Sequence, residues 1–273
     1  MDIFSHLSPR RFRDVDDLLA FISIYDDARR TRAFRKLLRA HQKQIRGAVC
    51  AEGGCGLGIL AVEMAKLGAQ HVFAVEQNPS LAKLARERIA KLPKAIWQRI
   101  EVIAAPLQEF RPPQKIDVLV HEFYGQLLYD EDLWALENLK FQPQLVLPDG
   151  GELLAGVVSS KQYTDRIVTN DILDALEGVL VAGLFEEKLR ELKFPVLQWK
   201  FGRGLVQIKN TLDNFTGDLL CFGVAVTHRG KRVCEAGRCP NWSYVWTPRK
   251  GERFKFEFRP AAAGRECHFH WLA

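Results

Sequence analysis

A glycine-rich segment early in the chain restricts its fold more than any other feature. The sequence Ala48-Val-Cys-Ala-Glu-Gly-Gly-Cys-Gly-Leu-Gly-Ile-Leu60 starts as a short apolar run, passes through four glycines and continues as a helical pattern to Lys66. A buried strand, a glycine turn and a helix form the opening unit of nucleotide-binding α/β sheets. Glycine is needed there because the backbone must pass close to a ligand and adopt dihedral angles that a Cβ disfavours. We therefore predict that Gly54, Gly56 and Gly58 bind a ligand.

The spacing of these glycines indicates the kind of ligand. The dinucleotide fingerprint, counted from Gly54, requires glycine at its sixth position, where this chain has Ile59. A Walker-type loop would need Gly-Lys-Ser/Thr, and no lysine follows. The next predicted strand ends at Glu76, 22 residues beyond Gly54, and a carboxylate there is suited to the two hydroxyls of a ribose. A ligand without a pyrophosphate fits best, so we predict S-adenosylmethionine, with a nicotinamide dinucleotide or a ligand-free turn as alternatives.

Helical and strand patterns alternate over the first 148 residues. Strands are predicted at 48–51, 71–76, 100–105, 117–120 and 144–147, and helices at 1–20 (loosely held), 21–45, 58–66, 78–91 and 131–138. This alternation predicts a parallel sheet with right-handed crossovers. Ligands of such sheets bind at the carboxyl ends of the strands, where Gly54, Glu76 and Glu122 fall.

The pattern changes at Pro148-Asp-Gly-Gly. The runs beyond it alternate apolar and polar residues between short turns, which is typical of antiparallel strands. We predict an α/β fold in which a Rossmann-like parallel sheet precedes a β-rich, barrel-like lobe. The expected parts are a helical segment (1–46), an S-adenosylmethionine-binding domain (47–148) and the β-rich lobe (149–273), which carries a helical insert near 170–192.

Charge and cysteine content limit the partners and the compartment. The net charge of +6 permits acidic partners without requiring them, and the basic residues between 29 and 46 are interpreted mainly as a solvated helix face. The six cysteines form no Cys-x-x-Cys pair and no signal peptide is recognised, so we expect a reducing cytoplasm. The spacing of Cys234, Cys239, Cys267, His268 and His270 matches no common zinc site, so no metal is predicted. No apolar run is long enough to span a bilayer.

Two glutamates lie nine residues apart after the fourth strand, in His121-Glu122-Phe-Tyr-Gly-Gln-Leu-Leu-Tyr-Asp-Glu131. Gly125 would permit a bend that brings both carboxylates into one site. Taken alone, the pair could equally be a helix-capping acid and a surface acid. However, Glu122 falls at the strand end where a substrate would meet the methyl donor, and its neighbours are apolar.

At this point the chain resembles the protein arginine methyltransferases. This family has a loop of the form Glu-x-x-Gly-x-x-x-x-x-Glu, and Glu122, Gly125 and Glu131 reproduce its spacing. The family helix Asp-x-x-Arg-Thr-x-x-(aromatic)-Arg corresponds to Asp27-Ala-Arg-Arg-Thr-Arg-Ala-Phe-Arg35. The resemblance covers roughly residues 25 to 160 well and the β-rich lobe loosely, and it is compatible with a compact, bacterial-type member.

The resemblance implies a role for each matching residue. Glu122 and Glu131 would clamp a substrate guanidinium, whose cationic, planar group suits two carboxylates that hold one nitrogen in line with the sulfonium methyl. The residues expected to hold the donor are Arg30 at its methionyl carboxylate, Glu52 and the glycine turn at its methionyl part, Glu76 at its ribose, and Gln108 (or Glu109) at its adenine.

Three departures from the family pattern affect these expectations. The family's Thr-His-Trp loop corresponds to Pro240-Asn241-Trp242, and Asn241 can hydrogen-bond Asp27 but cannot act as a base. The aromatic motif Tyr-Phe-x-x-Tyr is reduced to the run Arg11-Phe12-Arg-Asp-Val, which predicts a looser closure over the donor. The helix at 170–192 is short for the family's dimerisation arm, so a homodimer is possible but not required.

These observations favour an S-adenosylmethionine-dependent methyltransferase acting on a guanidino nitrogen of arginine. The acceptor could be protein arginine, or free arginine or a small guanidino compound, because a basic enzyme repels basic proteins at long range. The alternatives are a methyltransferase for another small-molecule or nucleic-acid acceptor, and a non-catalytic methyltransferase-like scaffold. A nucleic-acid partner is the less expected one.

Overall fold

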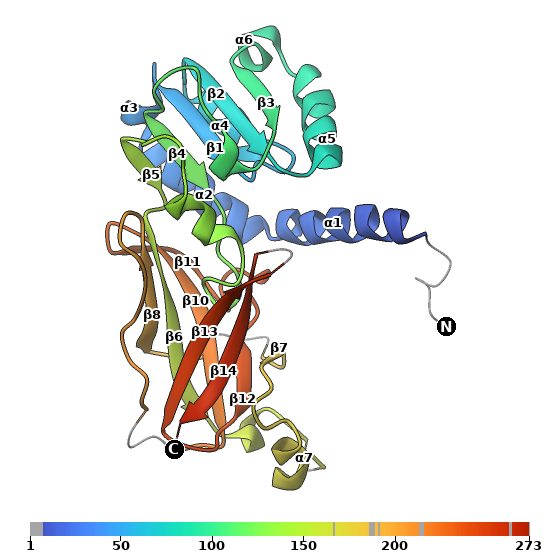
Figure 1. Ribbon diagram of the computed structural model, residues 1–273, viewed down its shortest axis with the longest axis vertical. Coiled ribbons are helices and arrows are strands. Elements are labelled where there is room, and N and C mark those ends of the chain that lie inside the picture. The colour runs from blue at the N-terminus through green and yellow to red at the C-terminus, as the bar shows by residue number, and fades with distance from the viewer. Residues whose placement is uncertain are drawn as a thin grey trace. The chain divides into compact units, whose positions relative to one another are not determined.

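A computed structural model describes residues 8–165, 167–185, 189–190, 192–212, 216–261 and 264–272 (Figure 1). The chain forms two compact units. The first comprises residues 1–122 and 139–147, and the second comprises residues 123–138 and 148–273. The segment that joins the two predicted clamp glutamates therefore leaves the first unit directly after Glu122 and belongs to the second.

The first unit contains a parallel sheet of five strands in the order β3-β2-β1-β4-β5. Along the chain these strands are β1 (Val49–Gly53), β2 (His71–Glu76), β3 (Ile100–Ala104), β4 (Val118–His121) and β5 (Leu145–Leu147). β1 lies in the centre and is buried at every position, as expected for a strand covered on both faces. The strand order reverses at β1, between β2 and β4, which confirms the predicted parallel sheet and places its ligand-binding edge after these strands.

The helices that follow the strands begin at recognisable caps. α4 (Ile59–Lys66) starts at Gly58, and α5 (Pro79–Ala90) starts after Asn78, whose side chain accepts hydrogen bonds from the amides of Ser80 and Leu81. Proline at the first position of α5 costs no hydrogen bond. Residues of α4 and α5 form one apolar cluster, with the short helix α6 (Lys94–Trp97) and β3 packed against it.

The region before the sheet differs from the single helix that was predicted over 21–45. It forms α1 (Pro9–Asp26), α2 (Ala28–Ala40) and α3 (Gln42–Ile45), with a break at Asp27. Asp27 has a non-helical ψ of 79° and its side chain caps α2. The sequence pattern missed this break because an aspartate that caps from inside a helical run leaves the apolar periodicity unchanged. Residues 1–7 lie outside the described part of the chain.

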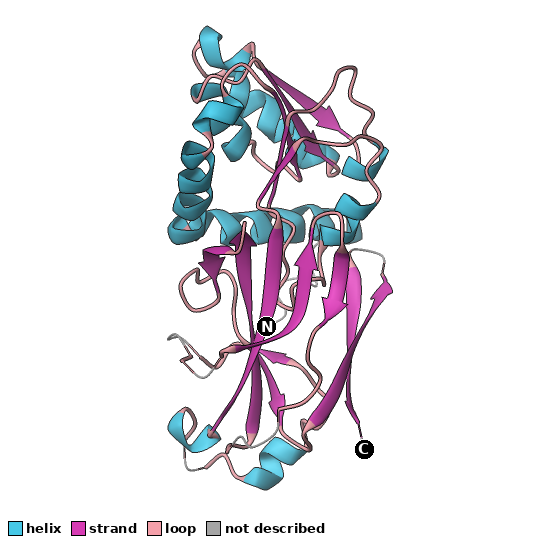
Figure 2. Cartoon of the chain, turned by 90° about the vertical axis from the view of Figure 1, so that its left-hand side faces the viewer, coloured by secondary structure: helices cyan, strands magenta, loops and turns pink. Residues whose placement is uncertain are grey.

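The second unit is built mainly from antiparallel strands (Figure 2). Its larger sheet has the order β7-β12-β10-β6-β8-β9, with β11 paired to β10, and β13 and β14 form a separate hairpin. In chain order the strands are β6 (Gly150–Val158), β7 (Val181–Ala182), β8 (Phe194–Lys200), β9 (Gly204–Gln207), β10 (Leu219–His228), β11 (Lys231–Glu235), β12 (Val245–Pro248), β13 (Arg253–Pro260) and β14 (Arg265–Leu272). The predicted β-rich lobe is therefore present as a sheet and a hairpin.

The predicted helical insert at 170–192 was wrong in its extent. Among the described residues of this insert, only α7 (Asn170–Asp174) is helical, and it is followed by turns and by the short strand β7. Gly178 and Gly183 both have positive φ, at 77° and 100°, which ends helical geometry in the described part of the insert.

Candidate functional site

The glycine turn lies between β1 and α4, and its backbone geometry requires glycine. Gly54, Gly56 and Gly58 have φ of 62°, 51° and 70°, in the left-handed region that side chains disfavour. The amides of this turn are used inside the protein. Cys55 N–H donates to the carbonyl of Val75 at 2.9 Å, and Gly58 N–H donates to the carbonyl of Cys55 at 2.7 Å.

Glu76, at the end of β2, is buried and faces this turn. One of its carboxylate oxygens accepts from Gly56 N–H at 2.8 Å, and the other accepts from Asn78 N–H at 2.8 Å. Each carboxylate oxygen can accept more than one hydrogen bond, which is the capacity that binding of ribose hydroxyls would need. The acid predicted from sequence is thus placed at the turn and also fixes its conformation.

Glu52, in β1, binds the start of α4. Its two oxygens accept from the amides of Leu60 at 3.3 Å and Ala61 at 2.7 Å. Burial, with smaller contributions from the charges of Glu122 and Glu76, raises the pKa of this carboxyl to about 8, against the lowering effect of the two amides.

The acidic residues decide which kind of ligand this turn can hold. In nucleotide-binding turns that take a pyrophosphate, free amides and a helix N-terminus attract the anion. Here the amides of Gly56, Leu60 and Ala61 already donate to carboxylates. An anion would meet two buried acids, whereas a cation would be stabilised. These buried carboxylates therefore suit a ligand with a sulfonium or ammonium group, and they disfavour a pyrophosphate.

Asp27 and Arg30 form the second part of the site. The carboxylate of Asp27 accepts from the amides of Arg29 at 3.0 Å and Arg30 at 2.8 Å, which starts α2 and fixes the position of Arg30. Arg30 is only 2% exposed. Its Nε lies 3.3 Å from a carboxylate oxygen of Glu122, and its Nη2 donates to the carbonyl of Glu122 at 3.3 Å. Two residues that the sequence predicted separately, 92 positions apart, are thus brought into one ion pair.

Two aromatic residues of α1 complete this part, and sequence reasoning missed them. The hydroxyl oxygen of Tyr25 accepts from Leu57 N–H at 2.9 Å. A Cβ added to Gly56 would lie 2.6 Å from that hydroxyl and closer still to the ring of Phe21. The aromatic cover that the sequence appeared to lose at Arg11-Phe12 is therefore supplied at the turn by Phe21 and Tyr25. Their spacing of four residues in a helical run was the available signal.

The acidic loop of the second unit holds Glu131 at the start of a short 3₁₀ helix (Asp132–Glu137). Gly125 was expected to permit the bend of this loop, and its φ lies outside the left-handed region. The left-handed residue is Leu128, with φ of 73°, which pairs with Gly125 in an isolated bridge. A side chain at Gly125 would clash with Asp130, whose carboxylate accepts from Leu127 N–H at 2.9 Å. Burial raises the pKa of Asp130, and backbone amides counteract this in part.

Further contacts fix this loop to the rest of its unit. The carboxylate of Glu137 accepts from the hydroxyl of Tyr129 at 3.0 Å and from the indole of Trp199 at 3.1 Å. The hydroxyl of Tyr124 donates to the carbonyl of Gly150 at 3.0 Å. Hydrogen bonds made by residues before and after Glu131 therefore hold the loop that carries it.

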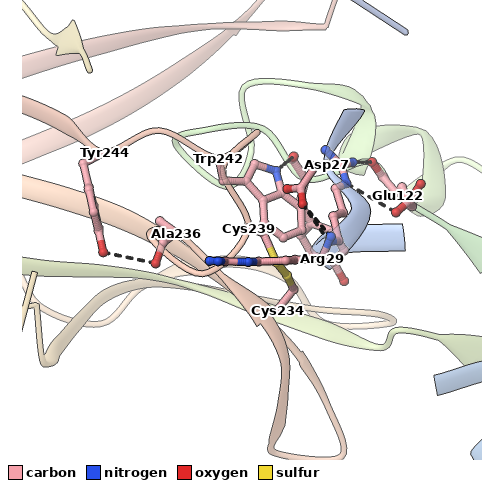
Figure 3. The surroundings of a disulfide bond; sticks show 10 residues. Asp27, Arg29, Glu122, Cys234, Ala236, Cys239, Trp242 and Tyr244 are labelled. Atoms are coloured by element: carbon pink, nitrogen blue, oxygen red, sulfur yellow. Dashed lines mark hydrogen bonds and ion pairs between the residues drawn. A yellow bond between two sulfur atoms is a disulfide. The ribbon is translucent and has the colours of Figure 1, made fainter. Parts of the chain in front are cut away.

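Asn241 lies in the turn after β11, two residues beyond Cys239. Cys234 and Cys239 form a disulfide, which the sequence did not predict (Figure 3). Trp242 N–H donates to the carbonyl of Cys239 at 3.1 Å, and its indole donates to the carbonyl of Tyr124 at 2.9 Å. The turn that carries Asn241 is thus held to the start of the acidic loop.

The remaining predictions concern adenine, metals, the basic run and membranes. Gln108 lies half-buried in a 3₁₀ turn (Leu107–Glu109) shortly after β3. Part of the basic run is paired internally, since Arg35 and Arg39 both approach Glu63, at 3.8 and 2.9 Å. Within the described ranges no cluster of histidine, cysteine or acidic residues is arranged to hold a metal. Across the same ranges, no helix combines the length and apolar character needed to cross a bilayer.

Sequence comparison finds protein arginine methyltransferases as relatives. The chain is 32% identical over 147 residues to a probable protein arginine N-methyltransferase 6.1 of Oryza sativa subsp. indica, an alignment that covers 52% of this chain and 38% of the relative. It is 33% identical over 151 residues to protein arginine N-methyltransferase 6 of Danio rerio, covering 52% and 42%. The chain thus spans well under half the length of these curated relatives. No family model matches.

Structure comparison extends the likeness to most of the chain. A Trypanosoma brucei PRMT1 enzyme-prozyme heterotetrameric complex with AdoHcy superposes with a TM-score of 0.65 at 15% identity, covering 91% of this chain and 96% of the other. A crystal structure of PRMT6 superposes with a TM-score of 0.68 at 13% identity, covering 94% and 99%. The chain is thus similar in sequence to protein arginine N-methyltransferases over about half of its length, and similar in fold to their solved structures over nearly all of it.

Proposed function

We propose that the chain is an S-adenosylmethionine-dependent N-methyltransferase that acts on a guanidino nitrogen of arginine in proteins. One observation carries the proposal. Glu76 and Glu52 accept hydrogen bonds from amides of the glycine turn and of the start of α4, and Glu122, whose charge acts on Glu52, pairs with the buried Arg30. Such a site suits a ligand with two cationic groups and one carboxylate, which describes the methionyl part of this donor. The names of the related proteins support the same activity.

The donor residues are assigned as follows. When bound, S-adenosylmethionine supplies a methyl group on a sulfonium. Glu76 would accept from the ribose, Arg30 would bind the methionyl carboxylate, and Glu52 with Gly54, Gly56 and Gly58 would hold the remainder of the methionyl part. Gln108 would contact the adenine. Asp27 acts through Arg30, because it fixes the first turn of α2.

The acceptor residues are Glu122 and Glu131. Two carboxylates bind a guanidinium through directed, charge-assisted hydrogen bonds and orient one of its nitrogens. They also favour positive charge on the far side of the group, which leaves the attacking nitrogen richer in electrons. Asn241 would contribute a hydrogen bond but no base, so removal of the proton would not depend on it.

A methyl-transfer assay with radiolabelled S-adenosylmethionine tests the proposal. An arginine-rich peptide and free arginine are offered in parallel reactions, with a matched lysine peptide as the control. Label in the arginine peptide alone is the expected result. Label in free arginine would shift the assignment to a small guanidino substrate, for which the net charge of +6 is the favouring observation. Label in none of them would remove the guanidinium assignment. We further propose a cytoplasmic location, where the Cys234–Cys239 disulfide would be open to reduction. Sedimentation will establish whether the protein forms a homodimer.

A further inference from the structure

Tyr25 has a polar group that the roles described so far do not use. Its hydroxyl oxygen accepts from Leu57 N–H at 2.9 Å, so its position is fixed on the glycine turn. In the part of the chain that the structure describes, this hydroxyl donates its own proton to no acceptor. The ring is half-buried. A fixed hydroxyl with an unused proton, placed over a ligand-binding turn, is a hydrogen-bond donor for a ligand.

The charges around Tyr25 indicate which end of the ligand it faces. Burial raises its pKa well above the ordinary value, and the charges of Glu52 and Glu122 raise it further. The phenol therefore keeps its proton at neutral pH. Glu52 and Glu122 lie on the methionyl side of the proposed site, whereas Glu76, assigned to the ribose, has no comparable effect on Tyr25.

The methionyl part of the donor offers one group that can accept this proton. Its sulfonium and ammonium are cations without an acceptor, and only its carboxylate has lone pairs to offer. Arg30 was assigned to that carboxylate, but its guanidinium also pairs with Glu122 at 3.3 Å. Because acidic side chains surround it, the methionyl carboxylate needs a second hydrogen-bonding group besides Arg30, whose guanidinium is shared with Glu122.

We propose that Tyr25 is a donor-binding residue of this chain, whose hydroxyl, held by Leu57 N–H, donates to the methionyl carboxylate of S-adenosylmethionine together with Arg30. The inference rests on the proposed function, since it needs this donor at the glycine turn. It adds a residue that the sequence did not single out, located in α1 four residues after Phe21.

Calorimetry with two ligands tests this role without any turnover. S-adenosylhomocysteine has the methionyl carboxylate, whereas 5′-methylthioadenosine lacks it and keeps the ribose and the adenine. The variant is Tyr25→Phe, which removes only the hydroxyl. Tyr163→Phe, in the second unit, is the matched control. Because a hydrogen bond to a charged group is strong, Tyr25→Phe should weaken S-adenosylhomocysteine binding by at least about tenfold and change 5′-methylthioadenosine binding by less than about twofold.

The alternative outcomes are separable. Equal weakening for both ligands would show that Tyr25 only supports the turn through Leu57, and it would overturn the inference. Unchanged binding of both ligands would overturn it as well. In either case the wild-type protein still binds S-adenosylhomocysteine, and the proposed function stands. If the wild-type protein binds neither ligand, the donor assignment fails together with the inference.

Discussion

Protonation of Glu52 should make donor binding depend on pH. The pKa of this buried carboxyl is about 8. At pH 7 the Glu52 carboxyl is then about 90% protonated in the free protein. Each pH unit below the pKa lowers the ratio of ionised to protonated carboxyl about tenfold. A cation bound beside it favours the ionised form. Binding at pH 7 should therefore release close to one proton, and donor affinity should rise about tenfold between pH 7 and pH 9.

The pH dependence of the stability of the ligand-free protein shows independently that raising the pH favours binding of the cation. The folded-state pKa of Glu52 lies above its ordinary value of 4.5. Its contribution to stability is therefore complete below about pH 4.5 and is lost as the pH rises through about 8. The bound cation reverses this loss. S-adenosylmethionine should accordingly raise the melting temperature more at pH 9 than at pH 6.

Calorimetry in buffers of low and high ionisation enthalpy counts the released protons directly. Glu52→Gln retains an oxygen for the α4 amides but cannot ionise, so its proton release at pH 7 should be close to zero. Subtracting this variant removes the contribution of the ligand's own amino group. If wild-type protein and Glu52→Gln release the same number of protons, Glu52 does not titrate on binding and the reasoning is refuted.

Three further changes test other parts of the site. Glu122→Gln should lower turnover by at least about 100-fold, because the clamp loses a charge that would bind the guanidinium. The affinity for S-adenosylhomocysteine should stay within a few fold of wild type, because the amide oxygen can still accept from Arg30 Nε. Near-normal turnover would show that Glu122 is not in the clamp. Asp130→Ala should lower the free energy of unfolding by about 1–3 kcal/mol, because Leu127 N–H loses its acceptor, and should lower kcat without changing donor affinity; denaturant titration and steady-state kinetics measure both, and Asp130→Asn should restore most of the loss. Replacing Cys234 and Cys239 by alanine should cost about 2 kcal/mol of unfolding free energy, the value expected for so short a loop; equal stability of wild type with and without dithiothreitol would contradict this.

The parallel sheet could be predicted from sequence because its signals are local. β2 was predicted at 71–76 and is found at the same residues, since an apolar run between turn residues leaves little alternative. The glycine turn and the Asn78-Pro79 start of α5 were equally clear. The insert at 170–192 was mistaken for a helix because its composition is compatible with one, and two glycines with positive φ decide otherwise.

The contacts of the predicted residues could not be read from the sequence in the same way. Spacing and resemblance predicted Glu52 and Glu76 as ligand-binding acids, but they did not show that these carboxylates accept from backbone amides of α4 and of the turn. Those bonds follow from burial, because an amide removed from water needs an acceptor whether or not a ligand is bound. Glu52 and Glu76 therefore fix the backbone of the site whether or not a ligand is bound.

Tyr25 shows why such a site contains more than its motif. No local pattern connects it to Leu57, 32 residues further along the chain, and the contact exists only because the break at Asp27 lets α1 and α2 take separate directions. That same aspartate fixes Arg30, which pairs with Glu122. One capping residue thus determines where the phenol and the guanidinium stand with respect to the glycine turn. Asp27→Ala should consequently weaken binding of S-adenosylmethionine through both the Tyr25 hydroxyl and the Arg30 guanidinium. Its effect should exceed the loss of either contact alone, and calorimetry on Asp27→Ala and Tyr25→Phe would measure the difference.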